Sequence, residues 1–230
     1  MKQLAGYSLF LFDFDGLLVN TEELQFKAYQ LMCAEYDLVM PWDFSTYCQF
    51  THQSTEVFRT ELFRSLPTLE EKQNNWQILY PKKFRLYTQL LKTQTIELMP
   101  GAEKLISLLQ EKEIKHAVVT HSSSEHFNLI CEQHPVLQKI PYKITRSDYQ
   151  HPKPHPECYQ LAISRFANKE EKVIGFEDSP RGLRALMGSS AKPILITSYK
   201  YLEMEELRQS GVDIYNTLDQ AYNTLIMNNP

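Results

Sequence analysis

The sequence predicts an α/β protein, a Rossmann-like doubly wound parallel sheet with an α-helical cap domain inserted after the first strand. Outside residues 20–94, short apolar or β-branched runs alternate with amphipathic segments, a pattern typical of parallel strands joined by helices. Within that stretch, none of the seven glycines lies between Gly16 and Gly101, and glycine is disfavoured inside helices. These observations predict a core formed by 1–19 and 95–230 and a helical cap formed by 20–94.

The core elements follow in order along the chain. The first strand is expected at 7–14, where an apolar run ends in two aspartates. The remaining strands are expected at 114–120, 142–145, 173–176 and 193–197. Helices are expected between them at 102–111, 123–133, 156–166 and 179–187.

The cap is predicted to begin with a helix near Asn20, because Glu23 follows three residues later in a capping-box-like spacing. A second apolar stripe runs from Trp76 to Leu91, and Pro81 is expected to kink or break that helix. The aromatic residues of this stripe are interpreted as core packing.

Composition excludes several classes of protein. The chain has 230 residues, 24 basic and 28 acidic side chains, and a net charge of −4, so a nucleic-acid partner is not expected. No apolar run of about 18 residues is present, so no membrane association is expected. The apolar opening ends at Asp13, too early for a signal peptide. Four well-separated cysteines indicate reduced thiols and a cytoplasmic location.

Reactive side chains follow the predicted strands. The ends of parallel strands form the ligand-binding edge of such a sheet, and charged groups do not belong in an apolar core. The residues concerned are Asp13, Asp15 and Gly16 after the first strand, Thr120, His121 and Ser122 after the second, Lys153 after the third, and Glu177 and Asp178 after the fourth.

Asp13 and Asp15 are two residues apart in an extended segment, so both can face the site while Phe14 faces the core. One carboxylate can attack phosphorus, and the other can protonate the leaving alcohol and later activate water. Four carboxylates gathered at one edge require a cation, and oxygen ligands suit Mg²⁺. Lys153 adds a positive charge and the Thr120 hydroxyl can donate to a phosphoryl oxygen. Gly16 leaves room for a ligand near the backbone.

At these residues the chain resembles the haloacid dehalogenase superfamily, in its β-phosphoglucomutase-like branch with a helical cap. The matching motifs are DFDG at 13–16, the hydroxyl of Thr120, KP at 153–154 and GFEDS at 175–179. They occur in the family's order and span nearly the whole chain.

The resemblance implies that Asp13 is a nucleophile that forms an aspartyl-phosphate and that Asp15 is the general acid and base. It also implies Mg²⁺ held by the Asp13 carboxylate, the backbone carbonyl of Asp15 and Asp178, with Glu177 bound directly or through water. The main-chain N–H of His121 and the Ser122 hydroxyl are expected beside the bound phosphate.

The expected function is hydrolysis of a small phosphorylated metabolite, such as a sugar phosphate, because Asp15 favours phosphoester chemistry. A β-phosphoglucomutase-like phosphotransferase is the first alternative. Two departures from those mutases argue against it. Gln25 stands where they carry a histidine, and residues 48–52, which correspond to their substrate-recognition turn, lack the glycine expected there. A non-enzymatic phospho-acceptor or binding module is the second alternative, although such a module needs neither Asp15 nor a lid.

Two further groups of residues have less specific interpretations. Basic residues of the cap could bind a substrate anion or form a solvated helical face; they are His52, Arg59, Arg64, Lys82, Lys83 and Arg85. Histidines and cysteines between 131 and 158 have spacings that could bind zinc, but the phosphate site already accounts for much of that segment.

Overall fold

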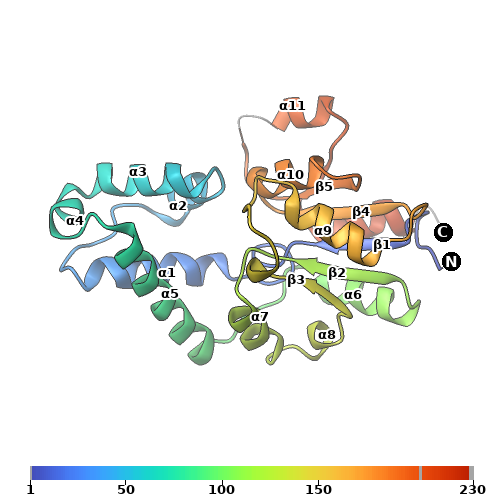
Figure 1. Ribbon diagram of the computed structural model, residues 1–230, viewed down its shortest axis with the longest axis horizontal. Coiled ribbons are helices and arrows are strands. Elements are labelled where there is room, and N and C mark those ends of the chain that lie inside the picture. The colour runs from blue at the N-terminus through green and yellow to red at the C-terminus, as the bar shows by residue number, and fades with distance from the viewer. Residues whose placement is uncertain (1, 202–203, 228–230) are drawn as a thin grey trace. The chain divides into compact units, whose positions relative to one another are not determined.

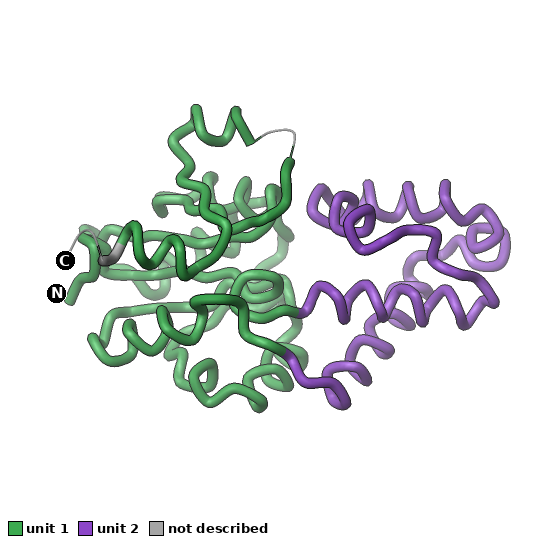
Figure 2. Tube along the Cα trace, turned by 180° about the vertical axis from the view of Figure 1, so that it is seen from behind, with its two compact units in different colours: residues 1–20, 97–230 green, residues 21–96 purple. Residues whose placement is uncertain are grey.

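The computed structural model describes residues 2–201 and 204–227, which form two compact units (Figures 1 and 2). The core unit comprises residues 1–20 and 97–230, and the helical unit comprises residues 21–96. The two junctions predicted from the sequence lie after residues 19 and 94. That the helical unit acts as a cap stays a prediction.

The core unit is built on a six-stranded sheet in the order β3-β2-β1-β4-β5-β6, and every neighbouring pair is parallel. The predicted doubly wound α/β fold is confirmed. The strands are β1 (Leu9–Phe12), β2 (Lys115–Val119), β3 (Tyr142–Ile144), β4 (Val173–Glu177), β5 (Lys192–Ile196) and β6 (Asp213–Tyr215).

The last strand, β6, was not predicted. It is a three-residue edge strand whose side chains are all half-buried, so it lacks the apolar run that marks the inner strands. The helical segments of the core are α6 (Ala102–Glu111), α7 (Ser124–Cys131), α8 (Pro135–Gln138), η1 (Arg146–Asp148), α9 (Glu157–Phe166), α10 (Pro180–Met187), α11 (Met204–Gln209), α12 (Leu218–Tyr222) and η2 (Asn223–Met227).

Alternate residues of β1 pack on opposite faces of the sheet, as strand geometry requires. Leu9 and Leu11 belong to a buried cluster with residues of α9 and α10. Phe10 and Phe12 lie on the other face and stack with Phe176 of β4, with ring centroids 6.3 and 5.1 Å away. Figure 1 shows α9 and α10 on one side of the sheet and α6 on the other. Both faces are therefore covered.

The strand order reverses at β1, since the chain continues to β2 and β3 on one side and later to β4, β5 and β6 on the other. Ligands of open α/β sheets bind at the carboxyl ends of the strands at such a switch point. The hydrogen bonding of the sheet extends one residue beyond the named strands here. The amide of Asp13 donates to the carbonyl of Phe176 (3.0 Å), and the amide of Thr120 donates to that of Ile144 (2.9 Å).

The helical unit contains α1 (Glu22–Ala34), α2 (Phe44–Thr51), α3 (Thr55–Ser65), α4 (Pro67–Lys72) and α5 (Trp76–Thr93). Aromatic side chains from several of these helices pack together. The Tyr29 ring lies 4.6 Å from the Phe58 ring and 6.4 Å from the Trp76 ring, centroid to centroid. The predicted core packing is confirmed for Trp76, which packs on Tyr29, and for the buried Tyr87, whereas Tyr80 of the same stripe is 41% exposed.

Two local predictions for the helical unit can be compared with the structure. Helix α1 begins at Glu22 after Thr21, and no side chain caps it, so the predicted box based on Asn20 does not form. Helix α5 is not broken at Pro81, and a kink there stays a prediction. Proline removes the hydrogen bond to the carbonyl four residues earlier. That carbonyl belongs to Gln77, an exposed residue in the first turn, where water can satisfy it.

No helix in the described ranges, 2–201 and 204–227, is both long and apolar enough to span a bilayer. All four cysteines are buried free thiols. The fold therefore depends on packing and hydrogen bonding, with no disulfide contribution.

Candidate active site

Lys153 lies between two buried carboxylates at the edge of the sheet. Its Nζ donates to Asp13 Oδ1 and to Glu177 Oε1, at 2.6 Å in each case, and to the carbonyl of Val119 at 3.0 Å. Lys153 is 6% exposed, Asp13 7% and Glu177 1%. Buried charges are tolerated when they are paired and hydrogen-bonded. The group carries two acids for one base, which favours a further cation.

The pKa values follow from this arrangement. Burial raises the pKa of Asp13 to about 7, with Lys153 opposing the shift and Glu177 adding to it. Burial lowers the pKa of Lys153, but the attraction of Asp13 and Glu177 prevails and holds it well above the usual value. Lys153 is therefore an ammonium ion at neutral pH. A cation bound beside Asp13 would favour the ionised carboxylate.

Asp15 is held separately, by groups that follow β2. Its Oδ2 accepts hydrogen bonds from Ser122 Oγ at 2.7 Å and from Thr120 Oγ1 at 3.3 Å. The amide of Ser122 donates to Thr120 Oγ1 at 2.9 Å, which orients that hydroxyl. Phe14, between the two aspartates, is fully buried and packs on Phe127, 4.8 Å between centroids. Asp13 and Asp15 therefore have different hydrogen-bonding partners, although both lie at the same edge of the sheet.

Gly16 follows in the left-handed region, with a φ of 81°, a conformation that glycine adopts without strain. Its amide donates to the carbonyl of Val19 at 2.9 Å and closes a tight turn. This turn directs the chain away from the sheet directly after Asp15.

Three carboxylates could hold a divalent cation. Asp13, Glu177 and Asp178 each offer an oxygen, and these atoms lie within 4.8 Å of one another. An all-oxygen donor set of this kind suits a hard cation such as Mg²⁺. The Asp15 carboxylate is not in the group, which agrees with its use of hydroxyl partners.

Gly182, which was not predicted as a site residue, makes room for Glu177. A Cβ atom at Gly182 would lie 2.0–2.3 Å from the atoms of the Glu177 carboxyl group. The Ser179 hydroxyl caps α10 by accepting from the Gly182 amide at 3.2 Å. The sequence did offer one signal for Gly182, since it lies inside a predicted helix. Glycine destabilises a helix, so its presence there suggests a close contact that a larger residue would prevent.

Two tyrosines were also missed. The Tyr159 hydroxyl donates to Glu177 Oε1 and lies 3.2 Å from Lys153 Nζ. Its place on the sheet-facing side of α9 resembles an ordinary core position, so the sequence carries no distinct signal. The Tyr149 hydroxyl donates to the carbonyl of Thr120 at 3.1 Å and lies 3.2 Å from His121 Nδ1.

The His121 ring is neutral at physiological pH. Burial lowers its pKa to about 3, and the cations Arg181, Lys153 and Arg146 add to the shift. A neutral imidazole beside a hydroxyl can accept or donate a hydrogen bond. The expected contribution of the His121 main-chain N–H stays a prediction.

The histidines near Lys153 do not form a predicted zinc group with Cys158. His151, His155 and Glu157 lie together on the exposed surface. Cys158 is instead buried in the cluster that packs against the sheet, because α9 turns it inward. Glu157 is engaged by the amides of Gln150 and His151 at 2.9 and 2.8 Å, so it stabilises the loop.

Several basic residues of the helical unit are engaged in ion pairs. Lys82 and Arg85 both contact Glu35, at 3.2 and 2.9 Å, and Arg64 contacts Glu61 at 3.1 Å. These pairs are compatible with the solvated-face interpretation.

For two of the basic residues the solvated-face interpretation is wrong, since His52 and Lys83 are buried. Lys83 Nζ donates to Gln25 Oε1 and lies 4.9 Å from the ring centroids of Tyr29 and Tyr87. Gln25 therefore accepts a hydrogen bond from a buried lysine.

Known proteins resemble the chain in sequence and in fold. The family model described as haloacid dehalogenase-like hydrolase matches residues 10–216. A 2-deoxyglucose-6-phosphate phosphatase 1 of Saccharomyces cerevisiae is 30% identical over 242 residues, covering 96% of this chain and 91% of the relative. A (DL)-glycerol-3-phosphatase 2 of Arabidopsis thaliana is 26% identical over 199 residues, covering 81% and 78%. The crystal structure of CbbY from Rhodobacter sphaeroides in complex with phosphate superimposes with a TM-score of 0.71 at 24% identity, covering 91% of this chain and 93% of that chain.

Proposed function

Because the chain belongs to the haloacid dehalogenase-like hydrolase family, we propose that it is a Mg²⁺-dependent phosphatase that hydrolyses a small phosphorylated metabolite through an aspartyl-phosphate on Asp13. The observation that carries the proposal is the juxtaposition of two differently held aspartates. Asp13 is ion-paired to Lys153 at 2.6 Å, while Asp15 is hydrogen-bonded to Ser122 at 2.7 Å. Two carboxylates with different environments are suited to two different roles.

In the first step, a carboxylate oxygen of Asp13 attacks phosphorus, so a new P–O bond forms as the ester P–O bond breaks. The electron pair of the broken bond goes to the leaving alcohol oxygen, which receives the proton of Asp15. Ser122 and Thr120 both contact Asp15 Oδ2. They therefore hold the acid in one orientation for this transfer.

In the second step, the deprotonated Asp15 accepts a proton from water, and the water oxygen attacks the phosphorus of the aspartyl-phosphate. The bond between phosphorus and Asp13 breaks, its electron pair returns to the carboxylate, and inorganic phosphate leaves. Lys153, whose Nζ lies 2.6 Å from Asp13 Oδ1, offsets negative charge in both steps.

The proposed cation site consists of the carboxylates of Asp13, Glu177 and Asp178, supplemented by the backbone carbonyl of Asp15. Glu177 would bind the cation directly or through water. Its Oε1 is also in contact with Lys153 and Tyr159. When bound, Mg²⁺ would offset the charge of the incoming phosphate and stabilise the ionised form of Asp13.

The names of the relatives support the substrate class. The two described above are named as phosphatases of glycerol 3-phosphate and of 2-deoxyglucose 6-phosphate, both small phosphate esters. A second acid such as Asp15 is useful when the leaving group is an alcohol that needs a proton. We therefore propose a phosphate monoester of a sugar or polyol as the substrate.

The test is release of inorganic phosphate from a panel of sugar phosphates, glycerol 3-phosphate, nucleotides and an aryl phosphate, with Mg²⁺ or with EDTA. Asp13→Asn is tested in parallel. Release that requires metal and is abolished by Asp13→Asn supports the proposal. Activity that persists in Asp13→Asn overturns the nucleophile assignment. Absence of release, together with turnover in a coupled assay on β-glucose 1-phosphate, would identify a mutase instead.

A further inference from the structure

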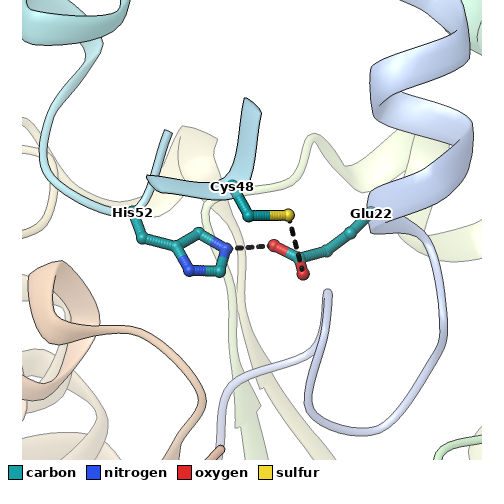
Figure 3. Close-up of side chains that lie close together, drawn as sticks. All are labelled: Glu22, Cys48 and His52. Atoms are coloured by element: carbon teal, nitrogen blue, oxygen red, sulfur yellow. Dashed lines mark hydrogen bonds and ion pairs between the residues drawn. The ribbon is translucent and has the colours of Figure 1, made fainter. Parts of the chain in front are cut away.

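A second group of metal-binding side chains lies within the helical unit, outside the residues assigned to phosphoryl transfer. Glu22 is the first residue of α1, Cys48 lies in α2, and His52 is the C-cap residue of α2. One ligand atom from each of these residues lies within 4.8 Å of the other two. Figure 3 shows the three side chains pointing toward a common centre.

Helix geometry brings the cysteine and the histidine together. Cys48 and His52 are four residues apart, a spacing that places two side chains on the same face of a helix. Glu22 reaches this face from α1 and uses both of its oxygens. Its Oε1 is hydrogen-bonded to His52 Nε2, and its Oε2 lies 3.9 Å from Cys48 Sγ.

The group is largely shielded from water. Cys48 is 1% exposed, His52 is 5% exposed, and the Glu22 side chain is 20% exposed. A thiol, an imidazole and a carboxylate concentrated at a buried position are costly unless they satisfy one another or a bound ion.

We propose that Glu22, Cys48 and His52 form a site for a borderline-soft divalent cation of the zinc type. Sulfur, imidazole nitrogen and carboxylate oxygen are the three donor types that zinc uses in proteins. Bond lengths of about 2.0–2.3 Å in a tetrahedron place neighbouring ligand atoms about 3.3–3.8 Å apart. The 3.9 Å between Cys48 Sγ and Glu22 Oε2 is close to that spacing. Three protein ligands leave a fourth position for water or another small ligand.

Charge and proton balance favour such an ion. Binding requires the thiolate of Cys48, so the thiol proton is released, and the imidazole binds in its neutral form. One thiolate and one carboxylate then offset the two positive charges of the cation. The bound site is electrically neutral, which suits its burial.

Cys48 differs from the other three thiols in its neighbours. Within the described part of the chain, Cys48 is the only cysteine that belongs to a group of three or more potential ligands. The donor atoms of this site, sulfur, nitrogen and oxygen, also differ from those of the all-oxygen group of Asp13, Glu177 and Asp178, which suits a harder cation.

The experiment is a titration of the full-length, Mg²⁺-saturated protein with Co²⁺, a spectroscopic substitute for zinc. Thiolate ligation gives a charge-transfer band in the near ultraviolet. The wild type is expected to give this band with one equivalent of Co²⁺, and added Zn²⁺ should abolish it. Because the protein is saturated with Mg²⁺ and no phosphate ester is present, the result does not depend on whether the proposed phosphatase activity is correct.

Cys48→Ser is expected to abolish the band. His52→Gln and Glu22→Gln are each expected to weaken Co²⁺ binding by at least about a hundredfold, which is more than the loss of an outer-shell partner costs. Cys33→Ser, which removes another buried thiol of the helical unit, should retain wild-type binding, as should His155→Gln in the exposed histidine group. Circular dichroism establishes that each variant is folded; should Cys48→Ser not fold, the His52→Gln and Glu22→Gln affinities decide. Absence of a band in the wild type, or an unchanged affinity in those two variants, overturns the proposal.

Discussion

At the residue scale, Gly182 determines where the Glu177 carboxylate can lie. We expect Gly182→Ala to displace this carboxylate, because the added methyl would lie 2.0–2.3 Å from its atoms. Alanine normally stabilises a helix interior by about 1 kcal/mol relative to glycine. Here we expect a loss of stability instead. We also expect Mg²⁺ binding to weaken by about tenfold or more, because the displaced Glu177 carboxylate supports the cation site. Thermal unfolding and Mg²⁺ titration measure the two effects.

Gly175→Ala is the matched control for that substitution. The atoms nearest to its added methyl belong to the end of the Leu186 side chain, the closest at 2.4 Å, and this side chain is flexible and carries no charge. This variant should lose stability while keeping Mg²⁺ affinity. Equal effects of the two substitutions on Mg²⁺ affinity would contradict a specific role for Gly182.

Asp15 provides a second prediction at this scale. Asp15→Asn should lower the turnover of alkyl phosphates by about 10²–10⁴-fold, the usual contribution of a general acid or base. Mg²⁺ affinity should change only a few-fold, because the carboxylate is bonded to Ser122 and Thr120 while only the backbone carbonyl is a proposed ligand. Steady-state kinetics and metal titration measure the two effects.

The leaving group gives an internal control for Asp15→Asn. An aryl phosphate has a good leaving group, so its first step needs the proton less, and formation of the aspartyl-phosphate should be less affected. A loss of Mg²⁺ affinity as large as the loss of turnover would rule out this division of roles.

At the scale of elements, β2 contains a buried histidine that affects stability. His116 is 2% exposed, its Nδ1 contacts the carbonyl of Ile114 at 2.8 Å, and its Nε2 has no partner. Burial lowers its pKa below the usual 6.5, partly opposed by the contact with Ile114. The folded protein therefore holds the neutral ring, while the unfolded chain takes up a proton below about pH 6.5.

It follows that the His116 contribution to stability is complete above pH 6.5 and is lost as the pH falls below it. We expect the free energy of unfolding of the wild type to decrease more steeply between pH 7.5 and 5 than that of His116→Asn, which does not titrate. His155→Asn, at an exposed histidine, serves as the control and should follow the wild type. Parallel curves for wild type and His116→Asn would contradict the prediction.

Elements with a strong local pattern were predictable from the sequence, and those defined by distant partners were not. The inner strands carry apolar runs because both faces of the sheet are covered, whereas the half-buried edge strand β6 carries none. The helix is not broken at Pro81, because the cost of a proline depends on where the carbonyl that loses its hydrogen-bond partner lies. Lys83 resembled a surface residue, although it donates a hydrogen bond to Gln25, 58 positions away, inside the helical unit.

The candidate site follows the same division. Asp13, Asp15, Thr120 and Lys153 could be predicted to lie close together because the strand ends mark one edge of a parallel sheet. The supporting contacts of Tyr159 and Gly182 were missed because they depend on how α9 and α10 pack. The group of Glu22, Cys48 and His52 was missed for a related reason, since Cys48 and His52 lie 26 and 30 positions from Glu22 in the sequence.

At the scale of the whole molecule, the helical unit is an insertion whose two ends leave the core at adjacent points. The amide of Asn20 donates to the carbonyl of Glu97 at 2.8 Å, and Val19 and Leu98 form an antiparallel bridge. Every strand of the sheet belongs to the core unit. A linker of about two to four glycine or serine residues can therefore join residue 20 to residue 97 in place of residues 21–96, since each residue spans about 3.3–3.6 Å.

We expect this shortened protein to fold cooperatively and to bind Mg²⁺, because Asp13, Lys153, Glu177 and Asp178 are all retained. It should hydrolyse a generic aryl phosphate, since Asp15 is retained as well. Its kcat/KM values for different sugar phosphates should converge, because the role predicted for the helical unit from the sequence, that of a cap, is to exclude water and to select among substrates. Circular dichroism, thermal unfolding and the substrate panel measure these properties, and a folded core that still discriminates among sugar phosphates as the full chain does would place specificity in the core unit instead.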